Sequence, residues 1–168
     1  MDLTISRILV PVDFSEYSER ALEYAIALAS RLNASLHLLH VVEDPVRSAA
    51  FGPEGAMTDL TELRMELMAD AEQRMIEYRG QAERAQVPVV TATRWGFTSP
   101  TILEYAEALN MDLIVMGTHG RTGMAHLFMG SVAERVLRHA PCPVLTVRAG
   151  ARDVGSEAVV HAMAGSRK

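Results

Sequence analysis

Cysteine is nearly absent from this sequence, since Cys142 is the one cysteine among 168 residues. A lone thiol cannot form an internal disulfide, so we expect a protein of the reducing cytoplasm. Long hydrophobic runs are missing too. No stretch of about 18 apolar residues occurs, and no membrane-spanning helix is expected. The N-terminal residues 1–7, MDLTISR, lack the extended apolar region of a signal peptide.

Basic charge is also scarce. The chain carries 16 lysines and arginines against 21 aspartates and glutamates, which gives a formal net charge of −5. Binding of DNA or RNA usually needs a basic face, so we expect no nucleic acid partner. The apolar share of 49% and the charged share of 22% are typical of a globular protein. This length suits one domain with a full core and is short for two.

Two common nucleotide-binding motifs are missing. The sequence contains neither Gly-x-x-x-x-Gly-Lys-Ser/Thr nor a Gly-x-Gly-x-x-Gly that follows a strand. These motifs form the phosphate loops of P-loop NTPases and of dinucleotide-binding enzymes. The sequence therefore excludes membership of either class by motif.

Short apolar runs alternate with stretches of helical periodicity. The runs predict five buried strands at residues 8–12, 35–42, 87–93, 112–116 and 143–147. The periodic stretches predict helices at about 15–32, 59–86, 99–109 and 131–139. Ser15 and Ser99 are the expected N-caps, with Pro100 at the first position of its helix. Such alternation favours an α/β fold, a parallel sheet with helices on both faces.

A glycine-rich connection follows the predicted strand 112–116. It contains Gly117, Gly120 and Gly130, and Ser131 begins the next helix. Glycines allow backbone N–H groups to approach a ligand without interference from a Cβ atom. The start of a helix adds N–H donors that lack partners inside the helix, and the positive end of its dipole. The connection therefore indicates a phosphate site, at the sheet edge where ligands bind in such folds.

This pattern closely resembles the universal stress protein family. Gly117-x-x-Gly120, nine further residues and Gly130-Ser131 are preceded by DLIVM and followed by VAERV and PCPVL, and residues 8–13 (ILVPVD) match that family's first strand and turn. The resemblance covers about residues 5–148 and is specific to the ATP-binding branch. It implies a domain over residues 1–148, with 149–168 as a flexible C-terminal tail.

The resemblance also implies the fold and the site. The fold would be Rossmann-like, of the adenine nucleotide alpha hydrolase type, with five parallel strands in the order 3-2-1-4-5. Asp13 would accept hydrogen bonds from ribose or adenine, Val41 would meet the adenine edge through its backbone, and Met116 would contact the base. Backbone N–H groups would hold the phosphates, with Arg121 as the cation. The nucleotide-binding residues implied are Pro11, Val12, Asp13, Val41, Met116, Gly117, Gly120, Arg121, Gly130, Ser131 and Val132.

The implied function is an ATP-binding regulatory module of the stress response. ATP, ADP or AMP would be the ligand, with Mg²⁺ as a further candidate, and two copies would form a homodimer through residues 143–148. A slow ATPase or self-phosphorylating enzyme is the alternative, with Ser131, Thr122 or Thr118 receiving phosphate. Binding is favoured because Asp13 is the one nearby acid, and we assign no catalytic residue and no metal ligand. A phosphorylation receiver is excluded, because the third strand ends without an aspartate.

Several of these residues also have simpler structural interpretations. Ser131 and Glu134 have the spacing of a capping box, so Ser131 could serve as a helix cap alone. Asp13 could be an ordinary turn residue or cap. Val41 and Met116 could be core residues, and only their places at strand ends argue otherwise.

The histidines and the cysteine favour structural roles. His119 and His126 have no second metal ligand at a fixed spacing, which is typical of exposed loop residues. His37 and His40 alternate with leucines on a predicted strand and are expected to be structural. Cys142 has no neighbouring cation that would lower its pKa, so no reactive role is expected.

Overall fold

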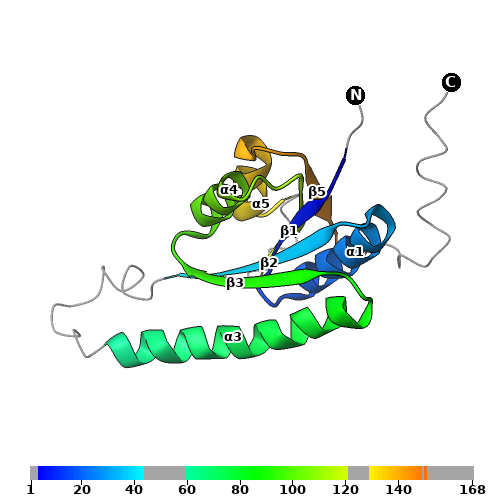
Figure 1. Ribbon diagram of the computed structural model, residues 1–168. Helices are drawn as coiled ribbons and strands as arrows, with labels where there is room; N and C mark the ends of the chain where they lie inside the picture. The colour runs from blue at the N-terminus through cyan, green and yellow to red at the C-terminus, as the bar shows by residue number, and fades with distance from the viewer. Residues whose placement is uncertain (1–3, 44–59, 121–128, 149, 151–168) are drawn as a thin grey trace, which may run out of the picture.

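The computed structural model describes residues 4–43, 60–120, 129–148 and 150. Within these residues, five parallel strands form one sheet in the order β3-β2-β1-β4-β5 (Figure 1). The strands are β1 (Arg7–Pro11), β2 (Ser35–Val42), β3 (Val89–Trp95), β4 (Leu113–Gly117) and β5 (Val144–Val147). The predicted architecture and strand order are confirmed.

Helices cover both faces of the sheet (Figure 1). They are α1 (Glu16–Leu32), α3 (Leu60–Arg84), α4 (Thr98–Ala108) and α5 (Ser131–His139). α1 and α3 pack on one face, and α4 and α5 on the other. None of the helices in the described part of the chain is long and apolar enough to cross a membrane.

The central strand β1 contributes to both halves of the core. Ile8 and Val10 pack in the cluster under α1 and α3, whereas Leu9 packs in the cluster under α4 and α5. All three side chains are fully buried. Successive side chains of a strand point to opposite faces, so a strand that is covered on both faces has to be apolar throughout. This explains the continuous apolar run in the sequence.

The ends of α1 follow the local sequence. The Ser15 side chain accepts a hydrogen bond from the Ser18 amide, so Ser15 is the predicted N-cap. Asn33 ends the helix in the left-handed conformation, which asparagine adopts more readily than most residues. The prediction for α4 is wrong. α4 begins at Thr98 after Phe97, without a side-chain cap, so Pro100 is the third helical residue.

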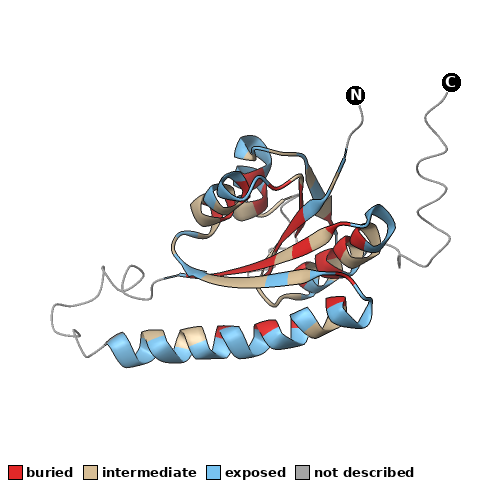
Figure 2. Cartoon of the chain, in the orientation of Figure 1, coloured by how far each residue is buried: buried red, intermediate tan, exposed pale blue. Residues whose placement is uncertain are grey.

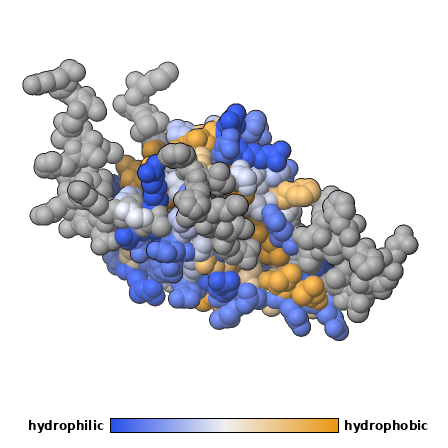
Figure 3. All heavy atoms as spheres, turned by 180° about the vertical axis from the view of Figure 1, so that it is seen from behind, coloured by the Kyte–Doolittle hydropathy of each residue, from blue (hydrophilic) through white to orange (hydrophobic). Residues whose placement is uncertain are grey.

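The long helix α3 is only partly amphipathic. Leu60, Leu63, Leu67, Ala71 and Met75 have the spacing of one apolar stripe in the sequence. The buried residues of α3 come from its C-terminal two thirds (Ala71, Met75, Tyr78 and Ala82), whereas Leu63 of the stripe is 41% exposed. The part of α3 that begins at Leu60 extends past the sheet and is largely exposed (Figure 2). Seen from behind, apolar side chains reach the surface between polar ones (Figure 3). The stripe therefore extends beyond the sheet that it would cover.

Strand β3 begins two residues later than predicted. Val87 is buried, and its amide donates to the Ala82 carbonyl, so it belongs to the turn after α3. Pro88 then accepts a hydrogen bond from the Leu36 amide before the strand pairs with β2. The apolar character of Val87 reflects packing in this turn.

His37 of β2 lies beneath α4, as a structural histidine. Its Nδ1 is 3.1 Å from the hydroxyl oxygen of Tyr105. Burial lowers the pKa of His37 below its ordinary value of 6.5, and the charge of Arg7 lowers it further. As the pH falls, His37 in the unfolded chain therefore takes up a proton at a higher pH than His37 in the folded protein.

This difference predicts a pH dependence of stability. As the pH falls through about 6.5, the unfolded state gains the proton and the free energy of unfolding decreases. Replacing His37→Asn removes this contribution, so the variant should lose less stability than the wild type between about pH 8 and about pH 5. Urea denaturation across that range measures both. Parallel pH profiles would contradict the prediction.

Candidate functional site: a cavity at the carboxyl edge of the sheet

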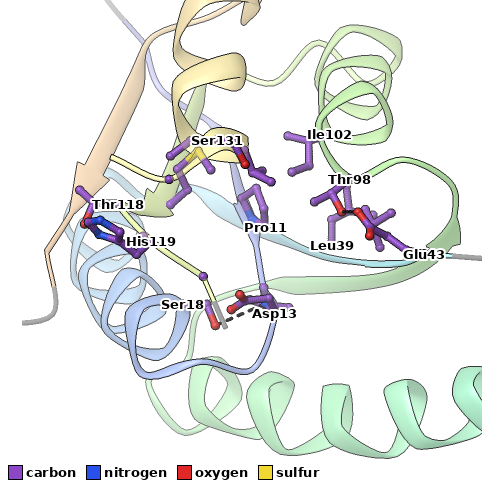
Figure 4. Close-up of a pocket in the computed structure, with 18 residues that line it drawn as sticks. Pro11, Asp13, Ser18, Leu39, Glu43, Thr98, Ile102, Thr118, His119 and Ser131 are labelled. Carbon is purple, nitrogen blue, oxygen red and sulfur yellow. Dashed lines mark hydrogen bonds between the residues drawn. The ribbon is translucent and has the colours of Figure 1, made fainter. Parts of the chain in front are cut away.

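A cavity lies where β1, β2 and β4 end, on the face covered by α4 and α5 (Figure 4). Its volume is about 240 Å³, several times the roughly 30 Å³ of one water molecule in the liquid. Ten of the eleven predicted site residues line it: Pro11, Val12, Asp13, Val41, Met116, Gly117, Gly120, Gly130, Ser131 and Val132. The eleventh, Arg121, lies outside the described residues.

Two glycines, Gly117 at the end of β4 and Gly120 after it, allow close contacts with the start of α1 and the turn before it. A Cβ atom on Gly117 would lie 2.8 Å from the Cβ of Tyr17 and 2.9 Å from its carbonyl oxygen. A Cβ atom on Gly120 would lie 2.5 Å from Oδ2 of Asp13. The chain therefore needs glycine at position 117 to pack against α1. At position 120, glycine leaves the space that the Asp13 carboxylate occupies.

The start of α5 presents backbone donors to the cavity. Gly130 is the N-cap, and the Glu134 amide makes the bond to its carbonyl, at 2.9 Å. The amides of residues 131–133 precede that bond, and donors of a first turn have no acceptor within their own helix. All three residues line the cavity. The positive end of the helix dipole lies there as well, so the arrangement favours an anion.

The structure corrects the role expected for the Gly130 amide. This N–H donates to the Thr118 carbonyl at 2.7 Å and is therefore already engaged. A Cβ atom at position 130 would lie 3.3 Å from that carbonyl oxygen. Gly130 thus leaves room for the Thr118 carbonyl and is hydrogen-bonded to it. The backbone donors available to a ligand are the amides that follow Gly130.

The capping-box interpretation of Ser131 is wrong. Gly130 occupies the N-cap position, and Ser131 is the first helical residue. The Glu134 carboxylate accepts a hydrogen bond from Arg138 at 2.8 Å. The Ser131 side chain is drawn among those around the cavity (Figure 4).

Asp13 organises the turn after β1. Its Oδ1 accepts hydrogen bonds from the Ser15 amide at 3.0 Å and from the Ser15 hydroxyl at 2.6 Å. Its own amide donates to the Ser18 hydroxyl oxygen at 3.4 Å. Oδ2 lies toward Gly120, at the edge of the cavity. Asp13 is therefore both a turn residue and part of the cavity wall.

The middle of the cavity wall is apolar. Pro11, Leu39 and Ile102 line it, together with Val41 and Met116. Val41 is 7% exposed and Met116 is 5% exposed, and both belong to the core beneath α4 and α5. Val41 and Met116 are therefore both core residues and cavity-lining residues, because this part of the cavity wall is formed by the core.

Eight lining residues were not among the predicted site residues. They are Ser18, Leu39, Glu43, Thr98, Ile102, Thr118, His119 and Ala133. Residues two apart on a strand share a face, and Leu39 and Glu43 lie two residues before and after Val41. Once Val41 was predicted, this alternation along β2 and the residue after it could have identified both. Thr98 donates a hydrogen bond of 2.5 Å to Glu43, which only the tertiary fold brings together.

His119 lies at the opposite side of the cavity from Glu43 (Figure 4). Its Nδ1 is 3.1 Å from the Thr118 hydroxyl oxygen, and its ring centroid is 5.3 Å from that of Tyr17. Within the described residues, no three histidine, cysteine, aspartate or glutamate side chains are grouped as a metal would require.

His40 and Cys142 are not among the residues that line the cavity, and the candidates Thr122 and His126 lie outside the described residues. His40 is buried, with Nδ1 2.8 Å from the Val12 carbonyl oxygen, and so has a structural contact. Cys142 is half-buried, and burial raises the pKa of its thiol, with a smaller contribution from Asp112. A thiol of raised pKa is a poor nucleophile at neutral pH, in agreement with the structural role expected.

The comparisons with known proteins establish the family. Residues 4–148 match the sequence profile of the Universal stress protein family. Universal stress protein MJ0531 of Methanocaldococcus jannaschii is 35% identical over 142 residues, which cover 84% of this chain and 81% of that protein. The chain belongs to the universal stress protein family.

Solved structures of universal stress proteins share the fold. UspA from Lactobacillus plantarum aligns with a TM-score of 0.76 and 30% identity, over 88% of this chain and 100% of that one. The structure of MJ0577 aligns with a TM-score of 0.76 and 29% identity, over 86% and 96% of the two chains. These matches confirm both the family resemblance and the Rossmann-like sheet.

The glycine contacts predict unequal effects of two alanine substitutions. Gly117→Ala places a methyl group against the Tyr17 backbone and should destabilise the fold by about 1–3 kcal/mol. Gly120→Ala meets only the end of the Asp13 side chain, which can move, and should cost less than about 1 kcal/mol. Urea denaturation measures both, with Gly150→Ala as the control because no atom of the other described residues lies within 4 Å of its Cβ position. Equal stability of the Gly117 and Gly150 variants would contradict the prediction.

Proposed function

We propose that this universal stress protein binds an adenine nucleotide in the cavity and acts as a nucleotide-dependent regulatory module. One observation carries the proposal. The cavity combines an anion-binding helix start, a carboxylate and an apolar wall within a single space. These three chemical environments suit phosphate, ribose hydroxyls and a flat aromatic base whose faces pack on apolar side chains.

The order of these environments along the cavity matches the order of groups in a nucleotide. Phosphates would lie at the amides that begin α5, near Thr118 and His119. The base, at the far end of the ligand, would lie on the apolar wall between Leu39 and Ile102 (Figure 4). Asp13, between the two ends, is the natural acceptor for ribose hydroxyls.

Two further proteins of the fold support the choice of adenine. Solved structures include a universal stress protein in complex with cAMP, with a TM-score of 0.61 and 22% identity. Another is the Archaeoglobus fulgidus protein in complex with dAMP, with a TM-score of 0.60 and 18% identity. At these identities the likeness concerns the fold. The adenine that both ligands share supports our choice for this chain.

We propose binding, with at most slow turnover. Asp13 and Glu43 are the carboxylates among the described lining residues, and they come from different elements of the fold. Phosphoryl transfer needs charge neutralisation at the transferred group, commonly by Mg²⁺ held on acidic side chains. ATP, ADP and AMP stay candidate ligands in this proposal, and Mg²⁺ is a candidate ion bound with them.

We also propose residues 1–148 as the domain and, from the single cysteine, a cytoplasmic location.

The binding proposal predicts that the purified protein either already contains an adenine nucleotide or binds ATP that is added to it. Acid extraction of purified protein should release the nucleotide, or calorimetry should show ATP binding. Gly130→Val should weaken binding by about 10–100-fold, because a side chain at position 130 presses on the Thr118 carbonyl and displaces the α5 amides that follow. Gly150→Val is the matched control, since no other described residue lies within 4 Å of its Cβ position.

Two outcomes decide between the alternatives. An empty extract together with no heat of ATP binding would overturn both binding and enzymatic use of the nucleotide. Steady release of ADP by the wild type, at a rate above that of the Gly130→Val variant, would instead establish ATP hydrolysis.

We also propose that two copies associate through β5. This strand lies at the end of the sheet and pairs with β4 on one side. Leu145 on it is 36% exposed. An apolar edge strand favours pairing with another chain unless it is covered.

This proposal predicts a change of mass. Light scattering of the wild type at micromolar concentration should give a mass twice the 18.4 kDa of one chain. Leu145→Lys should give the single-chain mass, because a charge on an edge strand opposes pairing. Ile76→Lys, at a residue of α3 that is 62% exposed, is the control and should leave the dimer intact. A monomeric wild type would contradict the proposal.

A further inference from the structure

Phe14, directly after Asp13, has a backbone conformation that is unusual for its side chain. Its φ is +63°, in the left-handed region. Residues with a Cβ atom seldom adopt this region, and a bulky aromatic residue is a true outlier there. Such strain persists only where the surrounding structure enforces it, and it concentrates at functional sites.

Three side chains from other elements pack around the Phe14 ring. The ring centroid lies 4.4 Å from that of His40 on β2 and 5.4 Å from that of Tyr78 on α3, which meets it edge-on. The guanidinium carbon of Arg74 lies 4.1 Å from the same centroid. Aromatic and cation–π contacts of this kind are directional and favourable. We call Phe14, His40, Tyr78 and Arg74 the Phe14 cluster.

The Phe14 cluster contacts the chain on both sides of Asp13. His40, which packs on the Phe14 ring, also has Nδ1 2.8 Å from the Val12 carbonyl oxygen. The Tyr78 side chain lies beside that of Ser18, whose hydroxyl oxygen lies 3.4 Å from the Asp13 amide nitrogen. The residues before and after Asp13 are therefore both fixed from β2 and α3.

The cluster and the cavity lie on opposite faces of the sheet. Phe14 packs with Tyr78 in the core beneath α1 and α3, whereas the cavity wall belongs to the core beneath α4 and α5. Asp13 lies between them, at the edge of the sheet, with Ser18 beside it (Figure 4). Its carboxylate thus faces the cavity, while the next residue is held from behind.

We propose that Phe14 is a positioning residue for the nucleotide site. Its ring, packed in the Phe14 cluster, holds the backbone in the left-handed conformation, and that conformation directs the Asp13 carboxylate toward Gly120 and the ligand. The inference rests on the proposed function, because it concerns the same cavity. It adds α3, which contributes no residue to the cavity wall described here, to the elements that determine nucleotide affinity.

Two substitutions of Phe14 separate positioning from packing. Phe14→Ala and Phe14→Asn both remove the ring from the cluster and should both reduce stability. Asparagine adopts the left-handed region far more readily than alanine. Phe14→Asn should therefore keep Asp13 in place, while Phe14→Ala should allow the turn to relax. We expect ATP affinity to fall about tenfold further in the alanine variant than in the asparagine variant, which corresponds to about 1.4 kcal/mol.

A double-mutant cycle with Asp13→Asn tests whether Phe14 acts through Asp13. In the wild-type and Phe14→Asn backgrounds, Asp13→Asn should weaken ATP binding. In the Phe14→Ala background it should have little further effect, because residues that act together are not additive. Calorimetry at a temperature where all variants are folded provides the affinities. Equal affinity of the two Phe14 variants, or full additivity with Asp13→Asn, would overturn the proposal.

Crystal structures of the unliganded variants test the positioning without a nucleotide. Phe14→Ala should show Asp13 moved away from Gly120, and Phe14→Asn should show it in place. If the wild type binds no nucleotide, the proposed function fails, and these structures still decide whether Phe14 places Asp13. An unmoved Asp13 in the alanine variant would overturn the positioning role.

Discussion

The structure depends on the burial of one strand from both sides. β1 pairs with β2 and β4 and lies under helices on both faces, so its buried side chains, Ile8, Leu9 and Val10, have to be apolar. Polar groups are excluded from this buried stretch and can appear only at its two ends. The first polar residue after β1 is Asp13, at the edge where β2 and β4 also end. The place of the chemistry thus follows from the requirement of burial.

Much of the fold could be predicted from the sequence because local patterns and tertiary structure agree. Continuous apolar runs predicted the buried strands, and the spacing of three glycines predicted the loop and its place before α5. Two of the errors concern apolar residues that fit a strand or helix pattern but do not lie in the sheet or against it. Val87 is apolar because it packs in the turn after α3. Leu63 continues a helical stripe beyond the sheet, which the sequence of the helix alone does not reveal.

The site was predicted less completely. Residues near the glycine pattern or at the end of a strand could be found, whereas Thr98 and Ile102 come from α4 and reach the cavity only through the fold. The engaged amide of Gly130 was also not predictable, because its acceptor is a carbonyl twelve residues earlier, across the loop. Spacing predicts which residues meet, but it does not predict which of their hydrogen bonds are already made.

Three helices begin around the cavity, and each contributes a residue of its first turn to the wall: Ser18 of α1, Thr98 of α4 and Ser131 of α5. In a sheet of parallel strands, each helix that follows a strand starts at the carboxyl edge, so the positive ends of these dipoles converge. The described lining contains no lysine or arginine, and the whole chain carries a net charge of −5. Among the described residues, attraction for an anion at this edge therefore comes from the direction in which the chain runs. Substitution of surface charges can change the strength of that field, but the contribution of the backbone keeps its sign as long as the fold persists.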